Sequence, residues 1–186
     1  GDLDKSKLFL NVVIANARTP RDKIGAYELL VLMYRSMEQN ELAKGCILKA
    51  LDHIWGESLG TFNVEEKFSY VRRLVHSMTD ADLLILTQMT HKKISAKMPF
   101  LMQLAEVSAA CQDFKLQDLA ALRMLELTVQ YGSLNPNFTG LAFAMGGLCL
   151  GRRHLHGEAY RYGHLAEVMS QIETPYGRQA IALHHY

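Results

Sequence analysis

The stretch GLCLGRRHLHGEAYRYGHLAEVM, residues 147–169, brings histidines, a cysteine, arginines and tyrosines close together in the sequence. His154, His156 and His164 are the candidate metal ligands, because histidines two residues apart can bind one ion from a loop. No further cysteine, histidine or carboxylate stands at a spacing typical of a zinc site, and Cys149 lies in an apolar run. We therefore expect these histidines to occupy a turn and a helix face, with neither a metal nor another cofactor bound.

Other combinations of reactive residues are equally weak candidates for a catalytic site. Cys46 and His53 lie two helical turns apart, too far for the hydrogen bond that activates a thiol nucleophile. Paired carboxylates occur at Glu65–Glu66 and Asp80–Asp82, where helix starts favour negative charge without any catalytic role. His184–His185 are expected to be helical residues. The sequence predicts no catalytic residue and no enzyme.

Positive charge is local rather than general. The run HKKISAK, residues 91–97, is predicted to be a solvated helix face, with an acidic partner as the alternative. Arg152 and Arg153 are expected to complement the carbonyl groups at a helix end, with phosphate binding as the alternative. The net charge of +1 predicts binding neither to nucleic acid nor to an anionic membrane, and no apolar run is long enough to span a bilayer.

The elements that must position these residues are predicted to be helices almost throughout. Between the residues that break helices, the common residues are the good helix formers Leu, Ala, Met, Glu and Lys. The alternation of apolar and polar residues that is typical of a strand is scarce. We expect about ten helices, near residues 6–18, 20–37, 41–55, 63–77, 79–97, 99–112, 116–131, 138–150, 158–172 and from 174 onward.

Capping residues define several of these boundaries. Thr19 can cap the helix that begins at a proline, and Asn63 and Thr79 each precede an acidic residue three positions on, which resembles a capping box. Gly132 fits a C-terminal cap. The sequence Lys97-Met98-Pro99 predicts a boundary between two helices, because proline disrupts helix interiors.

A spacing of residues occurs twice in the chain. The first series is Tyr27, Leu30, Val31, Tyr34, Ala43, Ile47 and Ala50, and the second, displaced by 116 residues, is Phe143, Gly146, Gly147, Leu150, Ala159, Gly163 and Ala166. Turns are expected at Gln39–Asn40 and His156–Gly157. Ala43 and Ala159 are expected where the two helices of each pair cross, since only a small side chain allows close approach there. This favours an all-α, αα-superhelix of stacked antiparallel helix pairs over a non-repetitive bundle.

The register also predicts a binding groove, since the first helix of each pair would face the concave side. Groove residues would include Glu28, Leu32 and Arg35 on the first pair, and Leu141 and Leu148 on the second. The first set is mixed and suits a peptide. The second set is apolar and is expected to be covered by another helix or by a second copy of the chain. A homo-oligomer is therefore one of the expected alternatives.

The repeated spacing resembles the tetratricopeptide repeat (TPR-like), a helix-turn-helix unit. More narrowly, NVVIANARTPRDKIGAYELLVLMYRSMEQNELAKGCILKAL resembles the helical segment of large multidomain signalling proteins that carry AAA-type ATPase, kinase and GAF or PAS sensor domains, often with a histidine kinase. SMTDADLLILTQM, LRMLELTVQYGSLNPNFTGLAFAMGGLCLG and GEAYRYGHLAEVM resemble later parts of that segment. The chain lacks a GxxxxGK[ST] loop and a phospho-accepting histidine box, so no parental enzyme activity is implied.

This resemblance implies one helical-repeat domain, residues 1–186, from a longer chain. Clear repeat units would cover about 23–56 and 139–172, with degenerate helices between them. The implied function is protein–protein interaction or signal relay, with a protein, a peptide or a neighbouring domain as the partner. Three scattered cysteines favour a reducing compartment, hence the cytoplasm. The alternative is a small-molecule- or metal-binding sensor domain, suggested by nine methionines, eight tyrosines and the histidine cluster.

Overall fold

Helices make up the regular structure of the computed structural model, which describes the backbone of residues 2–171 and the side chains of residues 5–20 and 22–171. The elements are α1 (Asp2–Asn16), α2 (Pro20–Ser36), α3 (Asn40–Trp55), the 3-10 turn η1 (Leu59–Thr61), α4 (Val64–His76), α5 (Asp80–Leu84), α6 (Lys92–Ala110), α7 (Phe114–Tyr131), α8 (Pro136–Arg152) and α9 (His156–Ser170). The helix expected from residue 174 and His184–His185 lie outside the described residues.

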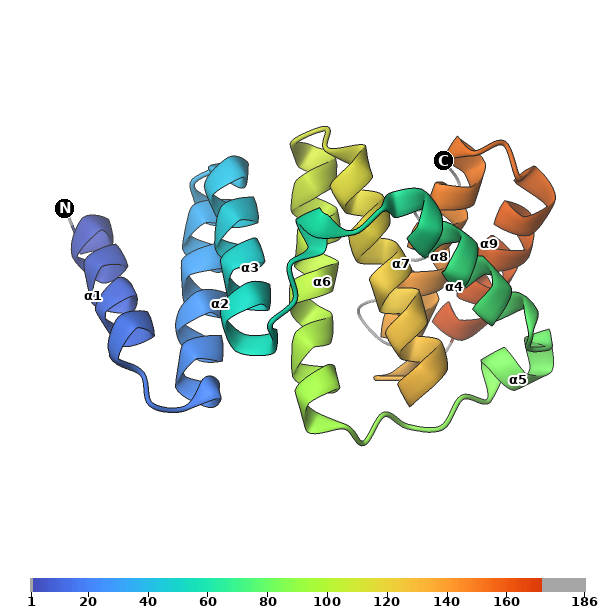
Figure 1. Ribbon diagram of the computed structural model, residues 1–186, viewed down its shortest axis with the longest axis horizontal. Helices are drawn as coiled ribbons and strands as arrows, with labels where there is room; N and C mark the ends of the chain where they lie inside the picture. The colour runs from blue at the N-terminus through green and yellow to red at the C-terminus, as the bar shows by residue number, and fades with distance from the viewer. Residues whose placement is uncertain (1, 172–186) are drawn as a thin grey trace.

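Seven of these helices form an elongated antiparallel stack, in the order α1, α2, α3, α6, α7, α8, α9 (Figure 1). Each packs on its neighbours, and their apolar faces share one continuous core that runs from Tyr27 to Met169. This confirms the expected all-α fold of stacked antiparallel pairs.

The helix starts follow the capping signals in the sequence. The Thr19 hydroxyl accepts a hydrogen bond from the Asp22 amide, and the Asn63 side chain accepts from the amides of Glu65 and Glu66. Thr79 and Asp82 form a reciprocal capping box at α5. These bonds satisfy amides that have no partner inside the helix, and they fix where α2, α4 and α5 begin.

Three turns of the stack have the same geometry. Glu38 between α2 and α3, Gln112 between α6 and α7, and His154 between α8 and α9 have φ of 56°, 59° and 59°. In each turn the next amide donates to the carbonyl five residues back, as Gln39 does to Tyr34. Glu38 and His154 are 116 residues apart, the displacement that the sequence indicates. Both turns lie earlier in the chain than expected, since Asn40 and His156 already begin helices.

The hairpin of α6 and α7 is a third copy, displaced by 74 residues, the distance from Glu38 to Gln112. The residues equivalent to the first series are all buried: Leu101, Leu104, Ala105, Ser108, Gln117, Ala121 and Met124. All of the first series is buried as well, and in the second only Gly147 and Ala159 are half-buried. The α6–α7 hairpin thus has the turn and the buried positions of the other two, although Ser108 and Gln117 differ in type from their equivalents.

We expect Ala43→Leu to lower the free energy of unfolding by about 1–3 kcal/mol, because Ala43 is fully buried and the larger side chain must displace packed neighbours. Ala159→Leu is expected to cost less, because Ala159 is half-buried. Urea denaturation of both variants measures the difference. Equal stability of the wild type and Ala43→Leu would show that the crossing has room that this packing does not provide.

Helices α4 and α5 lie outside the stack. The chain leaves α3, passes in front of α6, places α4 across α7, and returns through α5 to the start of α6 (Figure 1). α4 buries Phe68, Val71 and Val75 on one face. The segment from residue 56 to residue 91 is thus an excursion between the first hairpin and the second.

Two boundaries in this region differ from expectation. α5 ends at Leu84, and residues 85–91 are not helical, with the Met89 amide donating to the Ser133 carbonyl at 2.8 Å. α6 then begins at Lys92 and contains Pro99. The proline removes one backbone hydrogen bond, but the buried face on either side, with Met98 and Phe100, holds the helix together.

Candidate functional site

The three candidate histidines do not converge. His154 occupies the turn before α9, and His156 is the first residue of that helix, with ring centroids 5.9 Å apart. His164 lies two turns further on, exposed, with Nδ1 3.9 Å from Glu167 Oε2. Within the described part of the chain, no three His, Cys, Asp or Glu side chains are grouped so that they could hold a metal ion.

We expect His154→Gly to raise the free energy of unfolding by about 0.5–1 kcal/mol. A residue with a Cβ is strained at positive φ by about 1–2 kcal/mol, and glycine relieves that strain while losing more entropy on folding. Thermal and urea denaturation measure the gain. Destabilisation instead would mean that the imidazole makes a contact worth more than the strain.

Cys46 and Cys149 are buried, and neither thiol is activated. Burial raises the pKa of Cys46 to about 11. His53, which the sequence places too far from Cys46 for a hydrogen bond, has Nδ1 2.8 Å from the hydroxyl of Tyr27, and this contact joins α2 to α3. Burial, with help from the Asp118 carboxylate, also raises the pKa of Cys149.

Arg152 and Arg153 pair with a buried acid. Both guanidinium groups bind the carboxylate of Asp118 in α7, with Arg153 Nη1 2.6 Å from Asp118 Oδ2. Arg153 also bonds Glu65 of α4 at 2.7 Å and the carbonyl of Cys149 at 3.1 Å. The expected contact with a backbone carbonyl is present, but most of the contacts of the two arginines join α8 to α7 and α4. This arrangement favours a structural role for the arginines over phosphate binding.

A second buried acid, Glu57, lies just after α3. Its carboxylate binds Lys97 of α6 and Arg123 of α7, and Arg123 in turn bonds Glu126 at 2.7 Å. Burial alone would raise the pKa of Glu57, but hydrogen bonds from Arg123 and Lys97 and their positive charges bring it below its ordinary value. Lys97, from the basic run at residues 91–97, is therefore an internal residue, whereas His91, Lys92 and Lys93 are exposed.

Helices α4 and α5 are fastened to α9 by further ion pairs. Glu158 accepts from Arg72 and lies 2.9 Å from His76 Nε2, and Arg161 bonds Asp80 at 2.7 Å. The hydrogen bond from Arg72, with the contact to His76, lowers the pKa of Glu158 below its ordinary value, although burial acts in the opposite direction. The carboxylates near these helix starts serve as caps and ion-pair partners.

The predicted groove residues separate into two groups. Glu28 and Leu32 are exposed on α2, and Arg35 reaches across to Glu106 of α6 at 3.0 Å. Leu141 is buried and Leu148 half-buried. The first half of the predicted groove is thus open to solvent, whereas Leu141 of the second half lies inside the stack.

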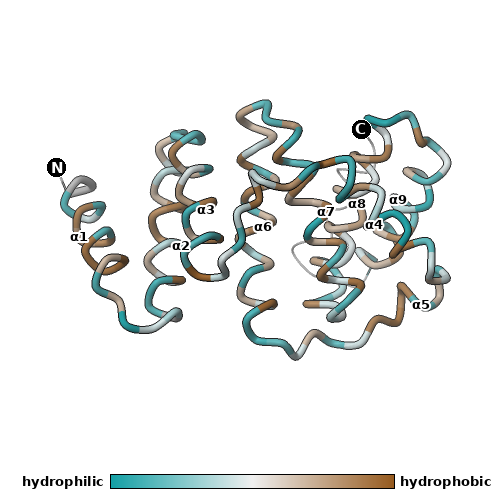
Figure 2. Tube along the Cα trace, viewed as in Figure 1, coloured by the Kyte–Doolittle hydropathy of each residue, from teal (hydrophilic) through white to brown (hydrophobic). Residues whose placement is uncertain are grey.

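The largest exposed apolar side chains near this open half form what we call the α1–α2 surface. Its members are Leu8, Phe9 and Val12 of α1, which are 67%, 67% and 51% exposed, and Leu29 and Leu32 of α2, which are 55% and 64% exposed. Apolar residues recur along both helices in Figure 2.

A groove of about 600 Å³ runs beside these residues, lined by Lys5, Ser6, Phe9, Leu10, Leu29 and Met33. Only one lining residue carries a charge. A surface of this kind favours contact with an apolar partner, because large apolar side chains gathered on one exposed face usually mark an interaction site.

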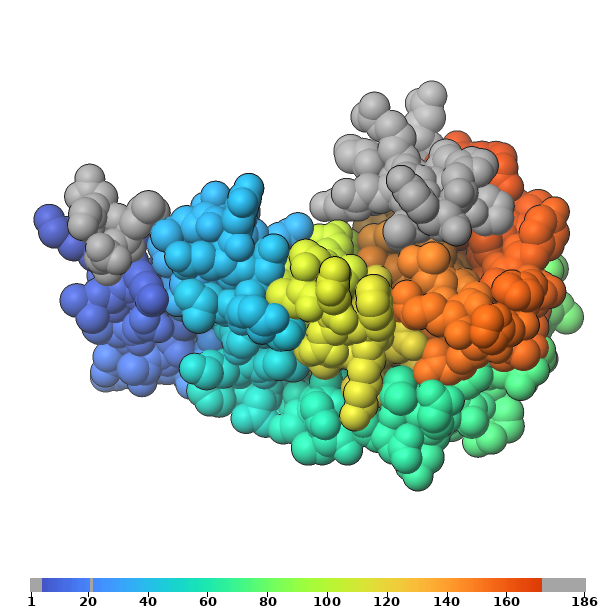
Figure 3. All heavy atoms as spheres, turned by 90° about the horizontal axis from the view of Figure 1, so that it is seen from above, coloured from blue at the N-terminus to red at the C-terminus, as the bar shows by residue number. Residues whose placement is uncertain are grey.

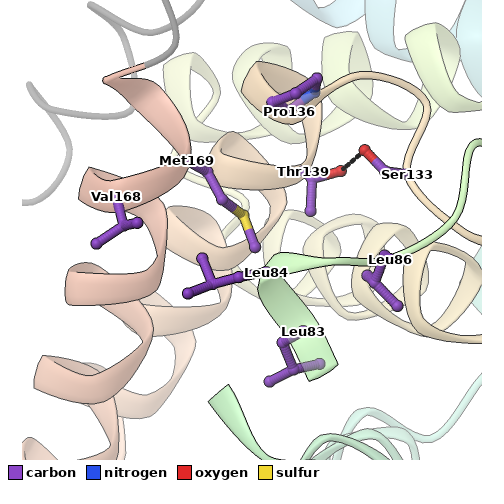
Figure 4. Close-up of a pocket in the computed structure, with 8 residues that line it drawn as sticks. All are labelled: Leu83, Leu84, Leu86, Ser133, Pro136, Thr139, Val168 and Met169. Atoms are coloured by element: carbon purple, nitrogen blue, oxygen red, sulfur yellow. Dashed lines mark hydrogen bonds between the residues drawn. The ribbon is translucent and has the colours of Figure 1, made fainter. Parts of the chain in front are cut away.

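A smaller cavity of about 180 Å³ lies between α5, α8 and α9 (Figure 4). Its lining is Leu83, Leu84, Leu86, Ser133, Pro136, Thr139, Val168 and Met169. The hydroxyls of Ser133 and Thr139 bond each other at 2.7 Å and are the polar side-chain groups in the wall. Neither this cavity nor the α1 part of the larger surface was indicated by the sequence motifs.

Comparison of the chain with protein-family models, with curated proteins and with solved structures finds no match. None of the described helices is long and apolar enough to cross a membrane.

Proposed function

We propose that this chain is a non-catalytic helical module that binds a protein, a peptide or a neighbouring domain. The observation that carries the proposal is the α1–α2 surface, where five large apolar side chains are more than half exposed. Burying such side chains against a partner releases roughly 25 cal/mol per Å² of apolar area, so this surface can supply affinity without any chemistry.

The same proposal includes signal relay within a multidomain ATPase or kinase. Ion pairs join helices that are distant in the sequence, such as Arg153 to Glu65 and Arg72 to Glu158. A stack fastened in this way can transmit a displacement from one end to the other as a unit. Three cysteines without disulfide bonds suit a reducing compartment, and we place the module in the cytoplasm.

The test uses one exposed leucine on the proposed surface and one away from it. Leu32→Glu is expected to lose the proteins that co-purify with the wild type from its native cells, as quantified by mass spectrometry. Leu42→Glu, on α3 and 48% exposed, is expected to retain them. An unchanged set of proteins with Leu32→Glu would overturn the proposal, and so would the absence of any such protein with the wild type.

The apolar cavity of Figure 4 favours a second candidate, a small-molecule sensor. Its volume and lining suit a neutral, mainly aliphatic ligand with one hydrogen-bonding group. A screen of small alcohols, ketones and esters by thermal shift is expected to give a stabilising ligand whose effect is lost in Thr139→Val and kept in Ser77→Ala. No stabilisation of the wild type at millimolar ligand would eliminate this candidate.

A further inference from the structure

A polar depression of about 240 Å³ on α4, which we call the α4 trough, is separate from the groove and the cavity described above. Its lining is Ser69, Arg72, Arg73 and His76. Both arginines stand three or four positions from Ser69 and from His76, so the four side chains share one face of the helix. The trough lies in the half of the molecule that holds α7, α8 and α9, whereas α1 and α2 form the opposite end (Figure 3).

Arg73 is the cation of the trough that the fold leaves without a partner. It is exposed, and its side chain forms neither an ion pair nor a hydrogen bond with any residue that the structure describes. Arginines between helices differ in this respect, since Arg123 binds Glu57 and Arg153 binds Asp118. A single exposed arginine is common on protein surfaces, so the side chains beside Arg73 decide whether a ligand can bind there.

The neighbours of Arg73 keep unused hydrogen-bond donors, although an acid already binds two of them. Glu158 of α9 accepts from Nε and Nη2 of Arg72, with Nε at 2.7 Å, and lies 2.9 Å from His76 Nε2. Nη1 of Arg72 and the Ser69 hydroxyl have no partner in the described part of the chain. The Glu158 pairs therefore hold Arg72 and His76 in position and leave donors for a second anion.

Charge and donor geometry define the class of ligand that fits the trough. Two arginines face one carboxylate, Glu158, so the net charge is positive. Glu66, one turn before Ser69, is not part of the lining. The donors of Arg73, Arg72 Nη1 and Ser69 come from separate points around the trough, which suits the three terminal oxygens of a phosphate monoester better than a planar carboxylate.

We infer that the α4 trough binds a phosphate group, either as free phosphate or as the phosphoserine of a partner segment. Arg73 supplies the forked pair of hydrogen bonds, Ser69 and Arg72 Nη1 donate to the remaining oxygens, and Glu158 stays bound to Arg72. This site goes beyond the proposed function and does not depend on it, because it shares no residue with the α1–α2 surface.

Isothermal titration calorimetry of the whole chain tests the site with two probes, inorganic phosphate and a Gly-Ser peptide with one central phosphoserine. Arg73→Gln is expected to raise the dissociation constant of the tighter probe by about tenfold or more, because it removes a forked, charge-assisted pair of hydrogen bonds. Tighter binding of the peptide would identify a phosphorylated segment as the source of the phosphate group. Equal binding of both probes would identify free phosphate.

Arg18→Gln is the matched control, because Arg18 is also exposed, lies just after α1 and loses the same charge. It is expected to bind both probes as the wild type does, and circular dichroism checks that each variant is folded. Three results would overturn the inference: no binding of either probe to the wild type at millimolar concentration, equal weakening by Arg18→Gln and Arg73→Gln, or equal affinity for the peptide without its phosphate. None of them would alter the outcome expected for Leu32→Glu.

Discussion

Replacing Glu57 by glutamine is expected to lower the free energy of unfolding by about 3–5 kcal/mol, the largest effect of any substitution considered for this chain. The Glu57 carboxylate neutralises two cations, Lys97 and Arg123, in a place where all three side chains are mostly shielded from water. Glutamine keeps the shape but removes the charge. Arg123 retains Glu126, whereas Lys97 is left buried without its counter-ion.

The pH dependence of this effect has a definite sign. Because the pKa of Glu57 is lower in the folded chain than its ordinary value, the stabilisation is present above about pH 4.3 and is lost as the pH falls through the folded-state pKa. Urea denaturation of wild type and Glu57→Gln should therefore differ most near pH 7 and converge in acid.

Glu41→Gln is the control for this prediction, because the Glu41 side chain is 70% exposed where it pairs with Lys44. Such pairs contribute little, and we expect a loss below about 1 kcal/mol. Similar losses for Glu57→Gln and Glu41→Gln would show that Glu57 does not hold the helices together in the way that its contacts indicate.

Gly132→Ala is expected to cost about 3 kcal/mol. Gly132 ends α7 with φ 98° and ψ −179°, a conformation that is essentially restricted to glycine. An added Cβ would also overlap the backbone carbonyl of Thr87, which accepts the amide of Ser133 at 2.8 Å. The substitution therefore strains the turn and separates it from the non-helical segment that leads into α6.

Gly56→Ala separates these two contributions. Gly56 ends α3 in the left-handed region with φ 64°, but a Cβ there would meet no atom within 4 Å. Alanine should cost only about 1 kcal/mol. Thermal denaturation of the two variants, measured side by side, checks the ordering, and a Gly132→Ala variant as stable as Gly56→Ala would contradict the close approach at Thr87.

Local signals in the sequence were sufficient to predict much of the fold. Thr19, Asn63 and Thr79 are caps whose partners lie within three residues, and such bonds depend only on the nearby sequence. The 116-residue displacement was visible because both copies place small residues, Ala43 and Ala159, at the same point.

The third hairpin was missed because its equivalent positions hold polar residues. Ser108 stands where the other copies have Tyr34 and Leu150, and Gln117 stands in place of the alanine. Propensity also misplaced the start of α6, since Pro99 is unfavourable in an isolated helix but is tolerated in a well-packed one. Tertiary packing overrode the local signal at each of these places.

The buried acids were missed for a different reason. The partners of Glu57 and Asp118 come from helices far away in the sequence, so a single residue gives no sign of them. A signal existed for Asp118, which lies among the apolar residues Leu116, Leu119 and Ala120 of the same helix. The crowding of reactive residues near His154, in contrast, was only a crowding in sequence.

Photo-cross-linking in the native cells tests most directly whether the α1–α2 surface is a protein-binding surface. A photoreactive amino acid at Leu32 is expected to give a covalent adduct with another protein or with a neighbouring domain, identifiable by mass spectrometry. The same group at Leu42, which is also exposed, is expected to give none above background. Equal cross-linking at both positions, or none at Leu32, would contradict the account.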